Sequence, residues 1–414
     1  MKKHFYITML GVSAATFTMG ITSCSSDDDN YEGGETTEQV ESIRDITSQY
    51  LNSVVYPTYT SLANETSDLY EYLDNAKAAL RDGTLTQSDI DRICTSFLNA
   101  RSYWEKTEAF LYGPATTFGI DPHIDTWPLD LNGLAVSLSN KQQIQMLDDG
   151  ENGISYAGSK LGQELLGFHG IEFIIFRNGS NRTLSSLKGV EDDPAFTGKN
   201  VTGEEELVYA TAVAGDLRDR CFQLEVAWRG ESASQSHLDR VEECELETQI
   251  GTSYYGDNML GATKAGSTFA TWQEVLITIF ESGCSNIANE VANTKMGNAY
   301  TGEDPNYIES PYSKKSFVDF YDNIISIRNS LYGGLDLGTP HEHSAMTLLK
   351  EMNPDLATKI ESSLNSSLDA LKECQKGTAF VDAPQSPKVK VAMDAINELD
   401  ANLKAAAQWS AGLR

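Results

Sequence analysis

The chain has 414 residues and a formal net charge of −29, from 31 Lys and Arg against 60 Asp and Glu. A charge of this size repels phosphate groups, so it excludes a nucleic-acid binder. Hydrophobic residues make up 40% of the chain, which is ordinary for a globular protein, and the length predicts two domains.

Residues 1–23 have the pattern of a lipoprotein signal peptide. Lys2 and Lys3 precede a short apolar run that ends in Ile-Thr-Ser-Cys, and this run is too short to span a membrane. Its last four residues resemble a bacterial lipobox, which implies that Cys24 is acylated, with palmitate among its lipids, and anchors the chain to a membrane. Ser25 in place of Asp favours the outer membrane of a Gram-negative cell.

Residues 24–37 are polar and acidic, which predicts a flexible tether. An acidic run directly after the acylated Cys also resembles a surface-export signal, and a plain spacer is an equally good interpretation. The protein therefore faces either the periplasm or the outside. No two of the remaining cysteines have CxxC spacing, so we expect buried free thiols at Cys94, Cys221, Cys244, Cys284 and Cys374.

The chain after residue 37 has apolar residues at three- and four-residue spacing, which predicts helices. The first span contains Pro57, where we expect a kink. A long irregular loop is predicted over 115–132, and loops of this length are often functional. Further helices are expected over 87–113, 133–148, 157–177, 203–229 and 234–247.

The segment 247–266 breaks the helical pattern and is the best candidate for a domain boundary. All segments beyond it again have helical periodicity, and no alternating strand pattern of any length occurs. The sequence therefore predicts an all-α fold of two helical bundles, over 38–247 and 248–414, each with four or more long helices.

The segment GFHGIEFIIFR, residues 167–177, is almost fully apolar but contains His169 and Glu172. Residues three apart share one face of a helix. A buried carboxylate must be paired, protonated or placed in a polar crevice. Gly167 and Gly170 each cost about 1 kcal/mol in a helix relative to Ala, but they allow a backbone or a ligand to come close. The pattern fits either a structural pair between helices or half of a metal site.

The pair does not complete a zinc-protease motif, because that motif needs a second His near Glu172 and Phe173 follows instead. Further ligands would have to come from elsewhere. His123 lies in the long loop with Asp121 and Asp125, where a metal site and a loop held by aromatic packing are both open interpretations.

Two other histidines, His341 and His343, stand in the segment TPHEH. This segment fits a helix start better than a metal site, with Thr339 as N-cap, Pro340 in the first turn and Glu342 closing a capping box.

Several segments resemble the imelysin-like family. The family motif GxHxxE stands at residues 167–172, and ARSYWEKTEAFLYGP (100–114) is similar to a family helix that ends in Gly-Pro. HIDTWPLD (123–130) resembles the loop that follows, and residues 309–334 resemble a Glu-Ser-Pro segment that opens a helix of the second domain.

The resemblance implies two helical-bundle domains with a site at their interface, in envelope proteins that are often iron-regulated lipoproteins. It implies His169 and Glu172 as ligands of an iron or zinc ion. It also implies a site lining of Gly167, Gly170, Arg101, Trp104, Glu108, Glu309, Ser310 and Ser313.

These observations favour a lipoprotein that binds a metal ion or a metal-bearing ligand in iron uptake, with iron-uptake components as partners. Nitrogen and oxygen ligands suit iron better than a soft metal. Two alternatives stay open. One is an imelysin-type metallopeptidase in which Glu172 is a ligand or general base, although the ligand set is incomplete for a catalytic zinc. The other is a non-catalytic module that binds a peptide or a glycan, with His169 and Glu172 purely structural.

Overall fold

The structure is a computed structural model, and it describes residues 37–413. The predicted signal peptide, Cys24 and nearly all of the predicted tether lie outside the described residues.

The described part of the chain is mainly helical, with only two short strands, which confirms the all-α prediction. Its helices up to residue 243 are α1 (Thr37–Tyr50), α2 (Tyr56–Arg81), α3 (Gln87–Glu105), α4 (Pro114–Thr117), α5 (Asp121–Ile124), α6 (Leu131–Ser139), α7 (Lys141–Leu147), α8 (Gly150–Lys160), α9 (Gly167–Ile175), α10 (Leu184–Leu187), α11 (Gly203–Arg229) and α12 (Gln235–Glu243).

The helices that follow are α13 (Tyr255–Leu260), α14 (Trp272–Ile277), α15 (Asn286–Glu290), α16 (Gly297–Thr301), α17 (Ser316–Tyr332), α18 (Ala345–Met352), α19 (Pro354–Gln375) and α20 (Pro387–Ser410). Three π-helical segments continue neighbouring helices: η1 (Leu51–Val55), η6 (Thr278–Ser285) and η7 (Val291–Lys295). Short 3₁₀ segments include η2 (Glu108–Phe110) and η3 (Gln163–Leu165).

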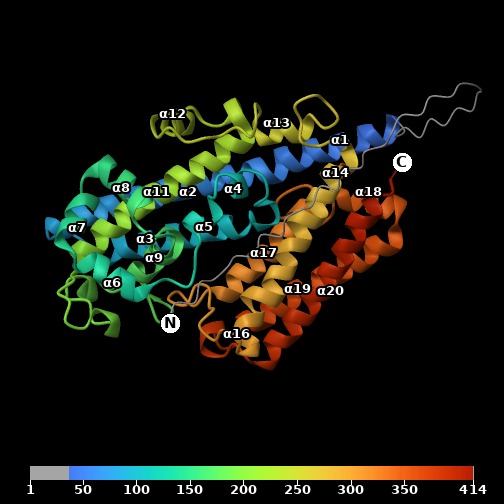
Figure 1. The fold of residues 1–414 in the computed structure, drawn as a ribbon. Coiled ribbons are helices and arrows are strands. Elements are labelled where there is room, and N and C mark those ends of the chain that lie inside the picture. The colour runs from blue at the N-terminus through green and yellow to red at the C-terminus, as the bar shows by residue number, and fades with distance from the viewer. Residues whose placement is uncertain (1–36, 414) are drawn as a thin grey trace, which may run out of the picture. The chain divides into compact units, whose positions relative to one another are not determined.

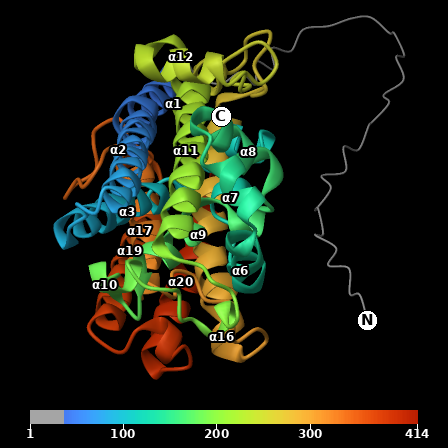
Figure 2. The same ribbon diagram turned by 90° about the vertical axis from the view of Figure 1, so that its left-hand side faces the viewer.

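Two groups of long helices build the core. In the first, α2 packs against α3 and α11, and in the second, α19 packs against α17 and α20 (Figures 1 and 2). The groups meet where α3 contacts α17 and where η2 contacts η6. The described residues all belong to one compact unit, and the domain boundary at residue 247 stays a prediction.

Helix α11 has the bounds that the sequence predicted. Thr202 and Glu205 form a capping box at its start, and Gly230, with φ of +59°, ends it. Nearly every residue of α11 is buried, because α2, α8 and α9 surround it. A helix that is buried on all sides has no single apolar stripe. Its ends are therefore defined in the sequence by the capping residues.

Several predicted elements differ from the structure. The helix expected over 157–177 is divided, because α8 ends at Lys160 and α9 spans only Gly167–Ile175. An antiparallel pair of two-residue strands, β1 (Phe176–Arg177) and β2 (Ser180–Asn181), follows α9 directly. The helix expected over 133–148 is two helices, α6 and α7, separated by Asn140, whose side chain caps α7.

The predicted helix start in TPHEH is wrong. Helix α18 begins at Ala345, because the Ser344 hydroxyl accepts from the amide of Thr347 at 3.1 Å and serves as the N-cap. Pro57 lies in the first turn of α2, directly after the π-helical segment η1. The five cysteines in the described residues are all free thiols, as expected, and only Cys244 is not fully buried.

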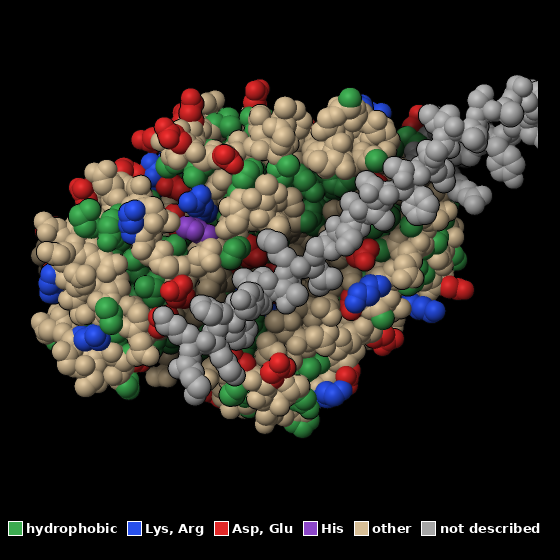
Figure 3. All heavy atoms as spheres, viewed as in Figure 1, with side chains coloured by type: hydrophobic (Ala, Val, Ile, Leu, Met, Phe, Trp, Pro, Cys, Tyr) green, Lys and Arg blue, Asp and Glu red, His purple; other side chains and the backbone are tan. Residues whose placement is uncertain are grey.

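Acidic side chains spread over the face of the molecule in Figure 3 rather than gathering in one patch. None of the described helices combines the length and the apolar character that crossing a membrane requires.

Candidate metal centre

The motif helix α9 is entirely buried, and its two glycines explain how it fits. Gly167 has a φ of +69°, and a Cβ atom there would lie 1.7 Å from the carbonyl oxygen of Ile124. A Cβ on Gly170 would lie 2.1 Å from the hydroxyl of Tyr209, on α11. The close approach predicted from the sequence is therefore present on both sides of His169, and it brings α9 against the end of α5 and against α11.

The carboxylate of Glu172 is fully buried and fully engaged. One of its oxygens accepts from the amides of Tyr312 and Ser313, at 3.1 and 2.8 Å, and from the Ser313 hydroxyl at 2.7 Å. Its other oxygen lies 3.3 Å from Nδ1 of His169. Glu172 thus ties α9 to the segment that precedes α17 and orients the His169 ring at the same time.

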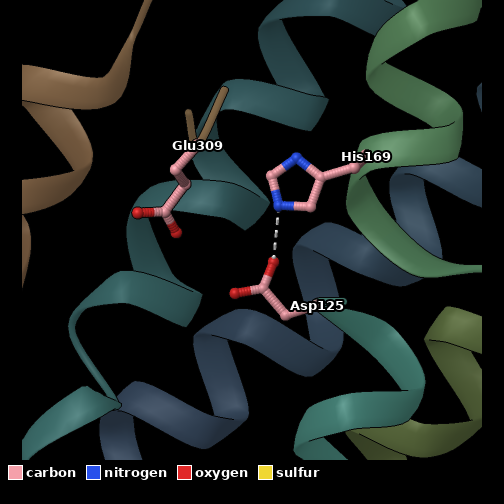
Figure 4. A group of neighbouring side chains, drawn as sticks. All are labelled: Asp125, His169 and Glu309. Carbon is pink, nitrogen blue, oxygen red and sulfur yellow. Dashed lines mark ion pairs between the residues drawn. The ribbon is translucent and has the colours of Figure 1, made fainter. Parts of the chain in front are cut away.

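The other ring nitrogen of His169 faces a group of carboxylates. Its Nε2 atom lies 3.1 Å from an oxygen of Asp125, the residue that follows α5. Asp125, His169 and Glu309 each offer one atom to a group in which all atoms lie within 4.8 Å of one another, and all three residues are buried. Figure 4 shows these side chains converging from three separate segments.

Two atoms of this group are buried without a hydrogen-bond partner: Nε2 of His169 and one oxygen of Glu309. Nε2 lies within ion-pair distance of Asp125, but the two atoms do not form a hydrogen bond. An unpaired buried polar atom costs about 1–3 kcal/mol, so the arrangement is one that a bound cation would relieve.

The side chain of Arg101, on α3, lies among the carboxylates of this group. Its guanidinium contacts the carboxylates of Asp125 and, at 2.5 Å each, Glu105 and Glu309. A fourth carboxylate, Asp319, lies 3.9 Å from its Nε atom. The indole nitrogen of Trp104 donates to the second oxygen of Asp125 at 2.7 Å, which fixes that carboxylate from the other side.

A second cation, Lys295, lies beside Arg101 at the end of η7 and is 2% exposed. Its ammonium group is 3.0 Å from Glu108, 3.3 Å from Glu309 and 3.8 Å from Glu105. Lys295 therefore links η7 to the C-terminal end of α3 and to η2.

The pKa values follow from burial and from these contacts. Burial lowers the pKa of His169, but contacts with Asp125 and Glu172 outweigh it and raise the pKa to about 9. Burial alone would raise the pKa of Asp125, yet Arg101 and His169 hold it well below its usual range. At Glu309, burial outweighs Lys295 and Arg101, so the pKa is raised. At Glu108, burial outweighs Lys295 and likewise raises the pKa.

Most residues implied by the resemblance meet at this centre. Arg101, Trp104 and Glu309 belong to the network around Asp125, and Glu108 joins it through Lys295. Gly167 and Gly170 flank His169, and Ser313 binds Glu172. The backbone of Ser310 has a φ of +49°, and its side chain forms a hydrogen bond with the carboxylate of Asp319.

The other histidines among the described residues lie elsewhere. His123 pairs with Asp216 of α11 at 2.7 Å, and His237 pairs with Glu225 at 2.5 Å. Neither belongs to the groups of potential metal ligands found among the described residues, and His341 and His343 precede α18 on an irregular segment.

Sequence reasoning missed Glu105, Lys295 and Asp319 as members of the centre, and it grouped Asp125 with His123 rather than with His169. A signal existed for Asp125, because it stands in the loop HIDTWPLD that resembles the family. Glu105 follows Trp104 within another such segment. Asp319 also lies within such a segment, residues 309–334. Nothing in the local sequence marks Lys295, whose role depends on contacts with distant segments.

Comparisons with known proteins agree with this architecture. The sequence profile of the Imelysin family matches residues 55–404. Iron-regulated protein A of Synechococcus elongatus is 23% identical over 322 residues, which cover 78% of this chain and 73% of that protein.

Two crystal structures share the fold. One is an iron-regulated protein A precursor from Parabacteroides distasonis ATCC 8503. It has a TM-score of 0.72 at 23% identity, and the match covers 91% of this chain and 96% of that one. The other, an imelysin-like protein from Psychrobacter arcticum 273-4, has a TM-score of 0.57 at 12% identity, covering 91% of this chain and 97% of that one.

Proposed function

This chain belongs to the imelysin family, and on that premise we propose that it binds a metal ion, or a ligand that carries one, as part of iron uptake. The ligands would be Asp125, His169 and Glu309. The observation that carries the proposal is their convergence: three buried ligand atoms from separate segments lie within 4.8 Å of one another, and two atoms of the group lack a hydrogen-bond partner.

The charges around the group favour a cation. Four carboxylates, those of Glu105, Asp125, Glu309 and Asp319, lie within 4 Å of Arg101, and Lys295 adds Glu108. Five carboxylates thus face two permanent cations. Buried carboxylates in excess of their counter-ions must take up protons or bind a metal.

The donor set fits iron. One imidazole nitrogen and two carboxylates are ligands that iron accepts readily, whereas a soft metal would favour sulfur. Two of the relatives carry "iron-regulated" in their names. Zinc accepts the same donors, so it is the control metal in the test.

Glu172 has a different role in this proposal from the one that the resemblance implied. Its three hydrogen bonds from residues 312 and 313, together with its contact to Nδ1 of His169, make it a positioning residue. A carboxylate on the far nitrogen of a ligating His fixes the ring orientation and increases the basicity of the ligand.

This engagement weighs against the metallopeptidase alternative. A general base must reach the water that it deprotonates, and both oxygens of Glu172 already have partners. The chain would need another residue for that step.

We further propose that Cys24 anchors the protein to the outer membrane, where iron-uptake components are its partners. The support is the lipobox-like segment and the acidic tether in the sequence.

Titration of the purified protein with Fe²⁺ under anaerobic conditions, and with Zn²⁺ in parallel, tests the proposal. We expect one ion per chain, and a loss of affinity of at least tenfold in His169→Ala. His237→Ala is the matched control, because it removes a buried His that pairs with a carboxylate outside the centre. Equal binding by wild type and His169→Ala would refute the proposed ligand set.

A further inference from the structure

Beside the proposed metal centre, a second group of carboxylates already holds a cation of the protein's own. We propose that the ammonium group of Lys295, which contacts Glu105 and Glu108, substitutes for a metal ion at a second position formed by Glu105, Glu108 and Asp125, and that it thereby limits the centre to one metal ion. This inference extends the proposed function, because the two positions share Asp125.

The second position has the geometry of a cation site. Glu105, Glu108 and Asp125 each offer an oxygen, and these oxygens lie within 4.8 Å of one another. All three residues are buried. Carboxylate oxygens in such a group are the donors that hard cations such as Mn²⁺ and Mg²⁺ prefer.

Lys295 brings its charge to this position. Its ammonium group contacts Glu108 at 3.0 Å and approaches Glu105 at 3.8 Å. It also lies 3.3 Å from an oxygen of Glu309, a member of the first group. A Lys ammonium is a compact point charge with three donors. Here it neutralises Glu105 and Glu108 of the second group, while Arg101 pairs with Asp125, the third member.

Lys295 is distant in sequence from the carboxylate that it contacts most closely. Lys295 is the last residue of η7, and it is 187 positions from Glu108. Arg101 cannot replace it, because the guanidinium already faces Asp125, Glu105 and Glu309. Removal of Lys295 would therefore leave Glu108 without its cation, in a buried group of carboxylates.

The test counts bound Mn²⁺ in the purified full chain by equilibrium dialysis with elemental analysis, supported by electron paramagnetic resonance. Lys295→Ala is expected to bind one ion more per chain than wild type. Lys295→Arg, which keeps the charge, and Lys106→Ala, which removes a lysine near the single carboxylate of Asp322, are expected to bind the wild-type number. Glu108→Gln added to Lys295→Ala should abolish the extra ion.

The outcomes separate this inference from the proposed function. Counts of one in wild type and two in Lys295→Ala support both. Counts of zero and one refute the first site but support the second, whereas one and one, or zero and zero, refute the inference. If Lys295→Ala is unfolded without metal, refolding that depends on Mn²⁺ supports the inference. Failure to refold with Mn²⁺ present overturns it.

Discussion

The packing of Gly170 against Tyr209 allows a quantitative test of how the motif helix is held. In Gly170→Ala the new Cβ would lie 2.1 Å from the Tyr209 hydroxyl and 3.2 Å from its Cζ atom. The hydroxyl donates to the carbonyl of Leu165 at 2.5 Å. The added methyl group therefore forces the hydroxyl away and breaks this partly buried hydrogen bond.

Three contributions set the magnitude. Leaving a buried polar group unpaired costs about 1–3 kcal/mol, and crowding in a packed core costs about 1–3 kcal/mol. Replacing Gly by Ala in a helix returns about 1 kcal/mol. The expected loss in the free energy of unfolding is therefore about 3 kcal/mol, within a range of roughly 1–5 kcal/mol.

A double-mutant cycle isolates the cause. Tyr209→Phe removes the hydroxyl and leaves a ring carbon 3.2 Å from the new Cβ, a distance that a small shift can relax. Gly170→Ala should therefore cost little in the Tyr209→Phe background, with a coupling energy of at least about 1 kcal/mol. The assay is urea unfolding followed by circular dichroism and by tryptophan fluorescence, whose transitions must coincide. Additive costs would refute the reasoning.

Two further predictions concern buried carboxylates. Glu172→Gln keeps the shape of the side chain but removes the charge that strengthens its hydrogen bonds with residues 312 and 313. Urea unfolding should therefore show a loss of about 1.5–3 kcal/mol in the free energy of unfolding, and titration should show a weaker affinity for metal. Unchanged stability would contradict the role assigned to Glu172. At Glu225, burial raises the pKa but is outweighed by hydrogen bonds with His237 and Thr60, so the pKa is lowered. A lowered pKa stabilises the fold above the unfolded value of about 4.3, and this contribution disappears as the pH falls through the folded value. Acid unfolding between pH 5 and pH 3 should therefore be steeper in wild type than in Glu225→Gln, and parallel curves would contradict this assignment.

Much of the fold follows from local chemistry. The bounds of α11 were predictable because a Thr-Glu capping box and a Gly are local signals that define its ends. The bounds of α9 were not, because the chain from Leu161 to Leu166 is as apolar as a helix needs. What interrupts it is the contact of Gly167 with the backbone of Ile124, which depends on the position of α5.

The candidate centre was likewise predictable from the sequence only in part. Spacing placed His169 and Glu172 on one face, and the resemblance added Arg101, Trp104 and Glu309, which the structure brings together. The separate tasks of His169 and Glu172 could not be read from spacing. They depend on residues 312 and 313, whose amides donate hydrogen bonds to the Glu172 carboxylate. Glu172 in turn contacts Nδ1 of His169, so that Nε2 faces Asp125.

The composition of the centre is itself an argument for function. A tie between two helical groups needs only apolar packing, and replacing buried ion pairs by well-packed apolar residues often leaves stability unchanged or improved. Here Arg101 and Lys295 draw at least five carboxylates into the interior, from segments that extend from α3 to α17. A ligand that binds only the folded state stabilises it by an amount that grows with the logarithm of its concentration relative to its dissociation constant. A cation bound by Asp125, His169 and Glu309 would therefore reinforce the junction of α5, α9 and the segment before α17. Binding and packing of the two helical groups are therefore expected to be coupled: the unfolding midpoint should rise with metal concentration in wild type and stay constant in His169→Ala.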